Sequence, residues 1–522
     1  MSRTYEAKAR RLVLVLGDQL QSESAVFDGF EPKHDAVLMV EARHEAEYVP
    51  QHKSRLVLFF SAMRHFRDEL KEQGVRVHYA ELDDRNNRGN LGEELERWIN
   101  ETRPESVSVV LPGDHRVLET LKRQAKLANC SLDILEDRHF LSQPDEFETF
   151  AEGRKSLLME HFYRQMRKKT KTLMKNGAPA GKKWNFDADN RETFGKSGPP
   201  EIKAPRSFRP DALTKEVIRM VEREFPDAPG KLDPFDYPVN AKQARDALRD
   251  FIQHRLECFG SFQDAMVCDK PYLYHSRLSC SLNLHMLDPR KAIDAAVNAY
   301  EKGDAPLNSV EGFVRQILGW REYVRGIYWT RMPEYERLNA LDADRPAPAF
   351  LWNADTEMNC VRQCVRQLVD HAYAHHIQRL MVLGLLSMLL GVRPYDVHRW
   401  HMSMYIDAVD WVSLPNVLGM SQYADGGIVG TKPYCATGAY INRMSDYCSG
   451  CRYNPKKAVG DDACPFTTLY WDFLSRNRNR LKSNRRMTMQ FKNLDRKSRS
   501  DIRSIKTQAD RVTRDLTRDG YL

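Results

Sequence analysis

Three kinds of polar side chain interrupt a long apolar stretch at residues 371–434, and they could do chemistry there. They are the neighbouring His375 and His376, Arg379, and Asp407. A histidine can take up or release a proton near neutral pH, and a buried charge needs a partner. We therefore expect Arg379 and Asp407 to form an ion pair if both lie inside the protein. A purely structural ion pair beside a surface histidine would explain the same residues.

Cysteines indicate a metal centre further along the chain. Cys448 and Cys451 form a Cys-Ser-Gly-Cys segment, and Cys464 follows after a loop. Two thiolates at this spacing can bind one metal centre, and a third can reach it through the loop. Cys360 and Cys364 both lie far upstream, one helical turn apart, and the spacing leaves the fourth ligand open between them. A structural zinc ion and an iron–sulfur cluster both accept such ligands.

Ser276 and Ser279 are three positions apart in the segment YLYHSRLSCSLNL. At this spacing the two hydroxyls can point at one anion, together with backbone N–H groups. An ordinary helix N-cap would explain the same residues.

The first part of the chain alternates apolar, strand-like runs with amphipathic helices. Asp18 and Gln19 directly follow the first apolar run, and Glu45 lies just beyond the second. The alternation predicts a parallel, Rossmann-like α/β sheet, in which ligands bind beyond the carboxyl ends of the strands. These three residues could contact such a ligand, although a helix cap and solvated loops would also explain them. We expect strands in 11–17, 36–42, 75–82, 106–111 and 132–137, and helices in 54–74, 93–101 and 116–130.

Two further regions follow the sheet. Residues 141–240 form a basic connector, and its Arg167, Lys168 and Lys169 lie among interleaved aromatic residues. This composition suits a nucleic-acid backbone, but also a solvated helix face. Residues 241–522 carry helical apolar spacing, with helices expected at 241–259, 289–303, 309–329 and 371–392. The predicted fold is therefore an α/β domain at 1–140, the connector, and a large all-α domain.

Length, charge and composition limit the possible classes of protein. A chain of 522 residues is too long for a single core, and a net charge of +8 permits a polyanionic partner without requiring one. The N-terminal residues lack an apolar signal core, and the longest apolar run is too short to cross a bilayer. We expect a cytoplasmic protein with no membrane partner, whose cysteines bind metal rather than form disulfides.

Nine short motifs, in order along the chain, carry a resemblance to a known family. They are GDQL at 17–20, SAMRHF at 61–66, HSRLS at 275–279, RQILGWREY at 315–323, AYAHHIQRLM at 372–381, HRW at 398–400, LPNVLGMSQYADGG at 414–427, INRMSDYC at 441–448 and ACPF at 463–466. The set resembles the photolyase and cryptochrome family. It is most similar to the iron–sulfur branch, which holds the prokaryotic (6-4) photolyases and their bacterial cryptochrome relatives.

The resemblance implies three cofactors: FAD in the helical domain, the antenna pigment 6,7-dimethyl-8-ribityllumazine in the sheet domain, and a [4Fe–4S] cluster. The family's ligand in a Met-Asn-Cys segment selects Cys360 as the fourth cysteine. The implied flavin positions are Ser276, Leu278, Ser279, Gln316, Arg321, Arg379, Asp407, Asp410 and Asn416. The implied antenna positions are Asp18, Gln19 and Glu45, and the cluster ligands are Cys360, Cys448, Cys451 and Cys464.

The resemblance also implies light-driven repair of pyrimidine–pyrimidone (6-4) photoproducts in damaged double-stranded DNA. Excited, reduced FAD would donate an electron to the flipped-out lesion. His376 matches a proton-handling histidine, with His375 beside it, whereas Leu380 replaces the second such histidine of the animal enzymes. Trp400 and Trp352 match positions that relay electrons, and His401 replaces the next expected aromatic. The residues expected to contact the lesion or the DNA are Trp320, Tyr434, Arg167, Lys168 and Lys169.

Two other functions stay open. A cryptochrome-type blue-light sensor would keep the same cofactors without repairing DNA, whereas a zinc-stabilised nucleic-acid-binding protein would hold no flavin. We expect a monomer. If residues 360–380 formed one helix, Cys360 and His376 would lie roughly 24 Å apart along its axis, so the cluster would lie outside the catalytic centre.

Overall fold

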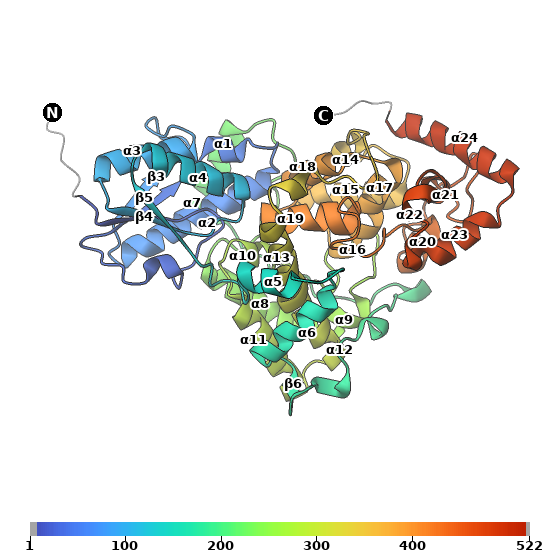
Figure 1. The fold of residues 1–522 in the computed structure, drawn as a ribbon, viewed down its shortest axis with the longest axis horizontal. Coiled ribbons are helices and arrows are strands. Elements are labelled where there is room, and N and C mark those ends of the chain that lie inside the picture. Colours follow the sequence, from blue (N-terminus) through green and yellow to red (C-terminus); the bar gives the residue numbers. More distant parts are fainter. Residues whose placement is uncertain (1–7, 518–522) are drawn as a thin grey trace.

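A parallel sheet of five strands organises the first part of the chain in the computed structural model, which describes residues 8–517 (Figure 1). The strand order is β3-β2-β1-β4-β5, and every neighbouring pair is parallel. The prediction of an α/β sheet followed by helices is confirmed. The elements are β1 Arg11–Leu14, β2 Ala36–Val40, α1 Arg43–Ala46, α2 Lys53–Glu72, β3 Val77–Ala80, α3 Leu91–Thr102, β4 Ser106–Val110, α4 His115–Leu127 and β5 Ser131–Leu135.

Alternate residues of the strands face two different hydrophobic cores. Leu12 and Leu38 pack with α3 and α4 in a smaller core. Val13 and Val37 belong to the larger core, which includes α2 and continues into the helical part. Because successive side chains of a strand point to opposite faces, helices cover both faces of the sheet.

The rest of the chain is mostly helical and, apart from the helix Ala212–Glu224 beside the sheet, forms the lower and right-hand parts of Figure 1. The helix predicted at 241–259 breaks at Arg255 into two pieces. The helices are α5 Pro144–Ala151, α6 Met159–Thr170, α7 Ala212–Glu224, α8 Ala241–His254, α9 Leu256–Phe262, α10 Ser279–Asn283, α11 Pro289–Lys302, α12 Leu307–Val314, α13 Glu322–Arg331, α14 Phe350–Asn353, α15 Asn359–His371, α16 His376–Gln378, α17 Leu385–Leu390, α18 Pro394–Met404, α19 Asp410–Pro415, α20 Gly438–Met444, α21 Pro465–Arg476, α22 Arg478–Leu481, α23 Thr488–Asp495 and α24 Arg499–Leu516. A short pair, β6 Met174–Lys175 and β7 Ala178–Pro179, lies in the connector.

Three π-helical segments interrupt the helices of residues 8–517. Arg315–Arg321 joins α12 to α13, Arg379–Gly384 joins α16 to α17, and Asn416–Ser421 continues α19. Such segments are rare and recur at functional sites. Each of them contributes to the cavity described below.

The prediction of a helix at 371–392 is wrong for its first residues. α15 ends at His371, and Ala372 adopts a left-handed conformation with φ of 49° that terminates the helix. α16 starts only at His376, so residues 372–375 form a turn. The single helix assumed for 360–380 is therefore broken, and a distance along one helical axis does not apply. A left-handed residue and a side-chain cap set this break, and apolar spacing reveals neither.

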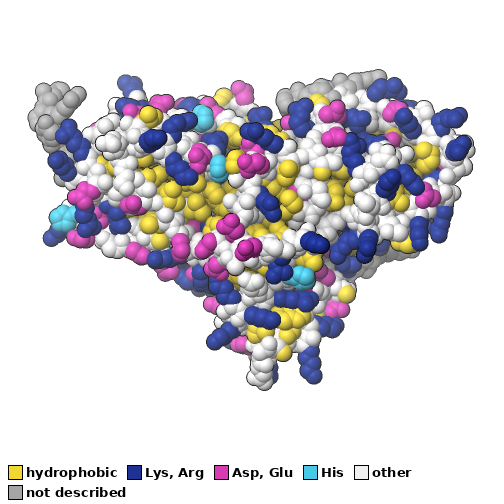
Figure 2. Space-filling model, viewed as in Figure 1, with side chains coloured by type: hydrophobic (Ala, Val, Ile, Leu, Met, Phe, Trp, Pro, Cys, Tyr) yellow, Lys and Arg dark blue, Asp and Glu magenta, His cyan; other side chains and the backbone are white. Residues whose placement is uncertain are grey.

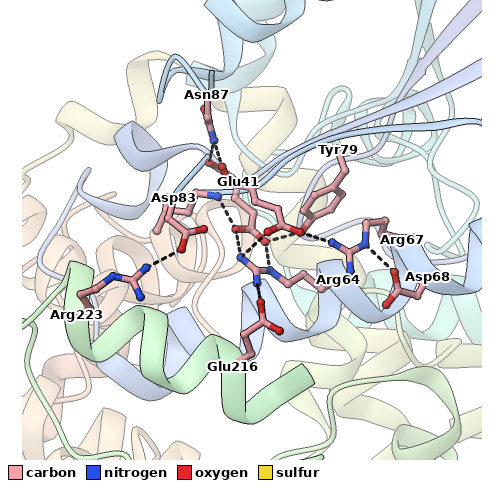
Figure 3. A network of polar contacts seen from close by, with 11 residues as sticks. Glu41, Arg64, Arg67, Asp68, Tyr79, Asp83, Asn87, Glu216 and Arg223 are labelled. Atoms are coloured by element: carbon pink, nitrogen blue, oxygen red, sulfur yellow. Dashed lines mark hydrogen bonds and ion pairs between the residues drawn. The ribbon is translucent and has the colours of Figure 1, made fainter. Parts of the chain in front are cut away.

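The connector does not form a layer of its own. Its α5 and α6 pack on α13 and the preceding π-helical segment, whereas its α7 packs along α2. Figure 3 shows the polar contacts at α7, where Arg64 of α2 donates to the buried Glu41 after β2 and to Glu216 of α7. Arg223 of α7 donates to Asp83 beyond β3 at 2.6 Å. One connector helix is thus fastened to the sheet and two others to the helical part.

Basic side chains gather on the helical side of the molecule. On the face shown in Figure 2, Lys and Arg lie over the lower lobe of α6, α11 and α12 and along the edge of the C-terminal helices. Within the described residues, we find no helix long and apolar enough to span a membrane.

Candidate active site and cofactor pockets

A cavity of about 320 Å³ opens among the helices of the second half of the chain. Its wall comes from α10, from the three π-helical segments and from the turn before α16. Residues that are far apart in the sequence therefore meet here. The predicted residues that line the cavity are Ser276, Ser279, Gln316, Trp320, Arg321, His375, His376, Arg379, Asp407 and Asn416.

Arg379 and Asp407 form the predicted ion pair. Arg379 Nη1 and Nη2 donate to Asp407 Oδ1 and Oδ2, both at 3.0 Å, and Arg379 Nε donates to the Ala374 carbonyl at 2.6 Å. Burial alone would raise the pKa of Asp407, but the guanidinium holds it below its ordinary value. The pair therefore stays ionised in a bidentate fork and fixes one wall of the cavity.

Several polar atoms at the cavity are buried without a hydrogen-bond partner among the described residues. They include His275 Nε2, His375 Nε2, Arg321 Nη2 and His401 Nε2. Native proteins rarely leave buried polar groups unsatisfied, so these atoms fit a polar ligand. Arg321 and the hydroxyls of Ser276 and Ser279 supply the donors that a pyrophosphate needs. The residues present therefore fit the FAD that the resemblance implies.

The two histidines lie at the start of α16 rather than inside a long helix. His375 is the N-cap residue and stacks on His275, with ring centroids 4.4 Å apart and an interplanar angle of 14°. His376 is surrounded by protein, but its side chain is exposed to the open cavity. Burial and the nearby Arg379 lower the pKa of His376 to about 4. The ring is therefore neutral at neutral pH and keeps an N–H that can donate.

Leu380 also lines the cavity, one turn beyond His376. The position that carries a second histidine in the animal enzymes thus holds an apolar side chain at the same wall. The other imidazoles at this cavity are those of His275, His375 and His401.

Three residues that the resemblance placed at the flavin or the lesion lie elsewhere. Leu278 is buried in the core and Tyr434 is half-buried, and neither lines the cavity. Asp410 lines the pocket of the sheet instead, where it accepts from Tyr328 and binds His398 Nε2 at 3.0 Å. We correct the expected role of Asp410 accordingly, because its carboxylate ties α13, α18 and α19 together.

A second pocket, of about 170 Å³, lies beyond the carboxyl ends of β1, β2 and β4, where ligands of parallel sheets bind. Asp18 and Glu45 line it, as expected. Arg116 of α4 donates to the two Glu45 oxygens at 2.8 and 2.6 Å and lies 4.2 Å from the ring centroid of Tyr48. Residues of α18 and α19 also line the pocket, so both parts of the molecule enclose it.

Gln19 does not line this pocket, which corrects its expected role. Its Nε2 donates to the carbonyls of Val110 and Leu111 at 3.2 and 3.1 Å, so it joins the ends of β1 and β4. Burial raises the pKa of Asp18 to about 7. That carboxyl is therefore partly protonated at neutral pH and can donate as well as accept. A pocket with apolar side chains and such a group fits the ribityllumazine that the resemblance implies, because its ribityl chain carries hydroxyls.

Four cysteines meet at one small hollow beside α15, α20 and the start of α21. The hollow is lined by Cys360, Cys448, Cys451 and Cys464, and Cys364 does not line it. Burial and the neighbouring thiols raise the pKa of Cys360 well above its ordinary value. Four thiols at one hollow therefore need a bound cation to ionise together.

Four cysteine thiolates are the donor set of an iron–sulfur cluster, in which each thiolate binds its own iron. A structural zinc ion accepts the same four donors. The cysteines present therefore fit the [4Fe–4S] cluster that the resemblance implies.

Trp400 lies one layer behind the cavity wall. Its indole N–H donates to a backbone carbonyl of α14 at 3.1 Å, which places it beside the helix of the half-buried Trp352. On its other side, its ring centroid is 5.8 Å from that of Tyr405, and Arg379 lies 4.1 Å from the Tyr405 ring. His401, at the position of the expected aromatic, lines the cavity.

Arg167 is wrongly predicted as a DNA contact. It is fully buried, and its guanidinium donates to three backbone carbonyls in the segment after α6. Lys168 and Lys169 are exposed on the same helix, and Lys169 pairs with Glu146 at 2.5 Å. Composition does not distinguish an arginine that satisfies backbone carbonyls from one that faces solvent.

Sequence reasoning did not identify His275 and Tyr405 as parts of the site. His275 precedes Ser276 in a motif that was interpreted through its serines alone, so a signal was present. Tyr405 meets Arg379 only across the fold, and nothing in its sequence neighbourhood predicts that contact.

Comparison with known proteins places the chain among its relatives. A family model described as deoxyribodipyrimidine photo-lyase-related protein matches residues 13–237. A (6-4) photolyase from Agrobacterium fabrum is 49% identical over 499 residues, which cover 95% of this chain and 98% of the relative.

Two solved structures share the fold. A bacterial class III photolyase from Agrobacterium tumefaciens has a TM-score of 0.55 at 16% identity, covering 84% of this chain and 86% of that one. A cryptochrome from Synechocystis has a TM-score of 0.51 at 15% identity, covering 85% and 89%. The structures show the fold alone, whereas the relative that is 49% identical over nearly the whole length shows the family. The chain belongs to the photolyase and cryptochrome family, in the branch of the bacterial (6-4) photolyases.

Proposed function

We propose that this protein is a light-driven DNA lyase that repairs pyrimidine–pyrimidone (6-4) photoproducts. The observation that carries the proposal is the position of His376 at the wall of an open cavity, beside the Arg379–Asp407 pair. The relative named (6-4) photolyase supports the same activity. The substrate would be damaged double-stranded DNA with the lesion flipped out, because a duplex hides its bases.

FAD is the cofactor that we propose for the cavity, where, once bound and reduced, it would supply the excited-state electron. Ser276, Ser279 and Arg321 would hold its phosphates, since their side chains bring hydrogen-bond donors to the cavity. The Arg379–Asp407 pair would flank its ring. A guanidinium beside the ring favours a reduced, anionic flavin electrostatically. Trp400 and Trp352 would relay electrons to this wall through the aromatic contacts behind it.

His376 would handle the proton of the reaction. Repair of this lesion returns a hydroxyl from one base to the other, which requires a proton donor. The neutral imidazole can donate a hydrogen bond to the lesion, and its protonated form can give up a proton and take it back afterwards. The side chain is exposed to the cavity, so a flipped base can reach it. Trp320 lines the same cavity and would contact that base.

Two more groups complete the proposal. The pocket at Asp18 and Glu45 would hold the ribityllumazine antenna, and the hollow of Cys360 and its three partners would hold a [4Fe–4S] cluster. A protein with this substrate acts where the chromosome lies, so we infer that it is cytoplasmic. We also propose that it is a monomer and that exposed lysines such as Lys168 contact the DNA.

The test is His376→Ala in protein purified with its flavin. We expect flavin content and affinity for (6-4) DNA to stay the same, while light-dependent repair is lost, because only the proton donor is removed. Repair is measured as loss of lesion under blue light, with exposed His34→Ala as the matched control. Normal repair by His376→Ala would refute the mechanism.

The sensor alternative makes a different prediction for the wild-type protein. A cryptochrome-type sensor would bind and photoreduce flavin but leave the (6-4) lesion intact under the same light. Wild-type protein that carries reduced flavin and removes no lesion would therefore replace the lyase proposal with the sensor.

A further inference from the structure

A buried glutamine holds the turn that presents the two histidines. Gln378 is fully buried at the third position of α16. Its Oε1 accepts from the backbone N–H of His375 at 3.0 Å and from Gln367 Nε2 at 3.0 Å. Gln367 Nε2 also donates to the carbonyl of Tyr373 at 2.9 Å. Two glutamine side chains therefore fix the backbone of the turn at residues 373 and 375.

The same glutamine reaches the cysteine hollow. Gln378 Nε2 donates to Gln367 Oε1 at 2.9 Å and to the hydroxyl of Tyr447 at 3.0 Å. Tyr447 lines the hollow and directly precedes Cys448. It is also almost fully buried, so neither hydrogen bond competes with bulk water.

A second contact ties Tyr447 to the other side of the hollow. Asn359, which directly precedes Cys360, donates its Nδ2 to the Tyr447 carbonyl at 2.9 Å. The residues before two of the four cysteines are thus bound to each other. A continuous set of hydrogen bonds then runs from Asn359 through Tyr447 and Gln378 to the backbone N–H of His375.

Direct contact does not connect the cysteines to the site. Of the described residues that line the cavity of His376, none is a cysteine. Any influence of the cysteine hollow on the histidines must therefore pass through the intervening side chains. Tyr447 and Gln378 make the connection that the hydrogen bonds show.

We propose that Gln378 and Tyr447 are positioning residues, through which the cysteine hollow sets the geometry of His375 and His376 in the cavity. This inference rests on the proposed function. It gives the cluster a role in repair that involves no electron transfer through the metal. An imidazole must lie within hydrogen-bond reach of the group it protonates, so a small shift of the turn lowers the rate without emptying the site.

The experiment uses holoprotein with Tyr447→Phe, Gln378→Met and the double variant. Tyr447→Phe removes one hydroxyl, and Gln378→Met removes the amide at similar length. We expect unchanged iron content, flavin content and affinity for (6-4) DNA. Repair per absorbed photon should fall about five-fold in each single variant, as expected for one neutral hydrogen bond. Repair per absorbed photon by the double variant should be no lower than that of the less active single variant, because the two substitutions break the same connection.

Tyr453→Phe is the matched control. Tyr453 lines the same hollow, but its hydroxyl donates to the exposed Glu357 at 3.3 Å. We expect repair by Tyr453→Phe at the wild-type rate. Unchanged repair in either single variant, additive losses in the double variant, or a fall in DNA affinity that matches the fall in repair would overturn the proposal.

Two outcomes are separated from these. If Tyr447→Phe alone loses iron, the repair rate of Gln378→Met tests the positioning role, since Gln378→Met leaves the hollow intact. If both variants lose iron or flavin, the two residues serve folding rather than positioning, and the inference is overturned. If His376→Ala is inactive and Tyr447→Phe repairs normally, the positioning role fails alone. If His376→Ala repairs normally while Tyr447→Phe is slow, the proposed proton donor fails and the positioning role is left to His375.

Discussion

The ion pair of Arg379 and Asp407 is expected to affect both the stability of the fold and the binding of flavin. Both are largely buried, with side-chain exposures of 23% and 7%. We expect Arg379→Ala to lower the free energy of unfolding by about 3 kcal/mol, because it leaves a buried carboxylate without its partner. It should also lose flavin, since one wall of the cavity is removed. Denaturant unfolding and flavin absorbance measure the two effects.

Arg249 provides the control for this change. It is exposed and pairs with Asp246 on the surface of α8, where an ion pair contributes little. Arg249→Ala should alter neither unfolding nor flavin content. Wild-type flavin binding and photoreduction in Arg379→Ala would show that the flavin pocket is assigned to the wrong residues.

Single residues could be predicted from the sequence where chemistry requires a partner. Two opposite charges in an apolar stretch predicted the Arg379–Asp407 pair, and a Cys-x-x-C spacing predicted that Cys448 and Cys451 would lie together. Arg167 and Gln19 could not be predicted in this way. Their partners are backbone carbonyls, and every segment of a chain offers those equally.

At the scale of elements, apolar spacing predicted where helices lie but not how they are interrupted. The π-helical segment Arg315–Arg321, for example, lies inside the stretch 309–329 that apolar spacing predicted as one helix. The turn before His376 likewise depends on a left-handed Ala372 and on the buried Gln378. These features set the direction in which the side chains of the site point. The sequence therefore predicted which residues form the cavity better than it predicted how their side chains are oriented.

The cysteine hollow joins elements that are far apart in the sequence. It brings the start of α15 against α20 and α21, and α21 packs in turn on α17 and α24. We expect Cys448→Ala to lose the iron of the proposed cluster and to unfold more readily, because metal binding at such a site is part of the folding free energy. Iron analysis and thermal unfolding measure both.

Cys435→Ala is the control for the cysteine change, because Cys435 is half-buried and does not line the hollow. It should keep its iron. Full iron content in Cys448→Ala would contradict the ligand assignment, and zinc in the wild-type protein would contradict the cluster type.

For the whole molecule, the sequence predicted the parallel sheet and the helical remainder but not how they are joined. The joining contacts link residues that are distant in sequence, such as Arg55 of α2 with the carbonyl of Ala408. His52 lies at another such junction. It caps α2, with Nδ1 accepting from the N–H of Ser54 at 3.0 Å, and its Nε2 is 3.0 Å from the carbonyl of Val369 in α15.

These contacts predict how stability depends on pH. With Nδ1 accepting, Nε2 carries the proton and donates to Val369, so His52 is neutral in the folded protein. Burial lowers its pKa from 6.5 to about 4. The unfolded chain therefore takes up a proton as the pH falls through 6.5, before the folded protein does. The stabilisation is complete above pH 6.5 and is lost as the pH falls toward 4, by up to about 3 kcal/mol.

His52→Gln isolates this contribution from the other buried histidines. A glutamine can cap and donate but does not titrate, so we expect the free energy of unfolding to fall less steeply between pH 6.5 and 4 than in the wild type. Denaturant unfolding across this range measures both slopes, with exposed His34→Gln as the control. Equal slopes in His52→Gln and the wild type would mean that His52 titrates alike in both states. The junction between the sheet and the helices would then tolerate a charge that its burial is expected to exclude.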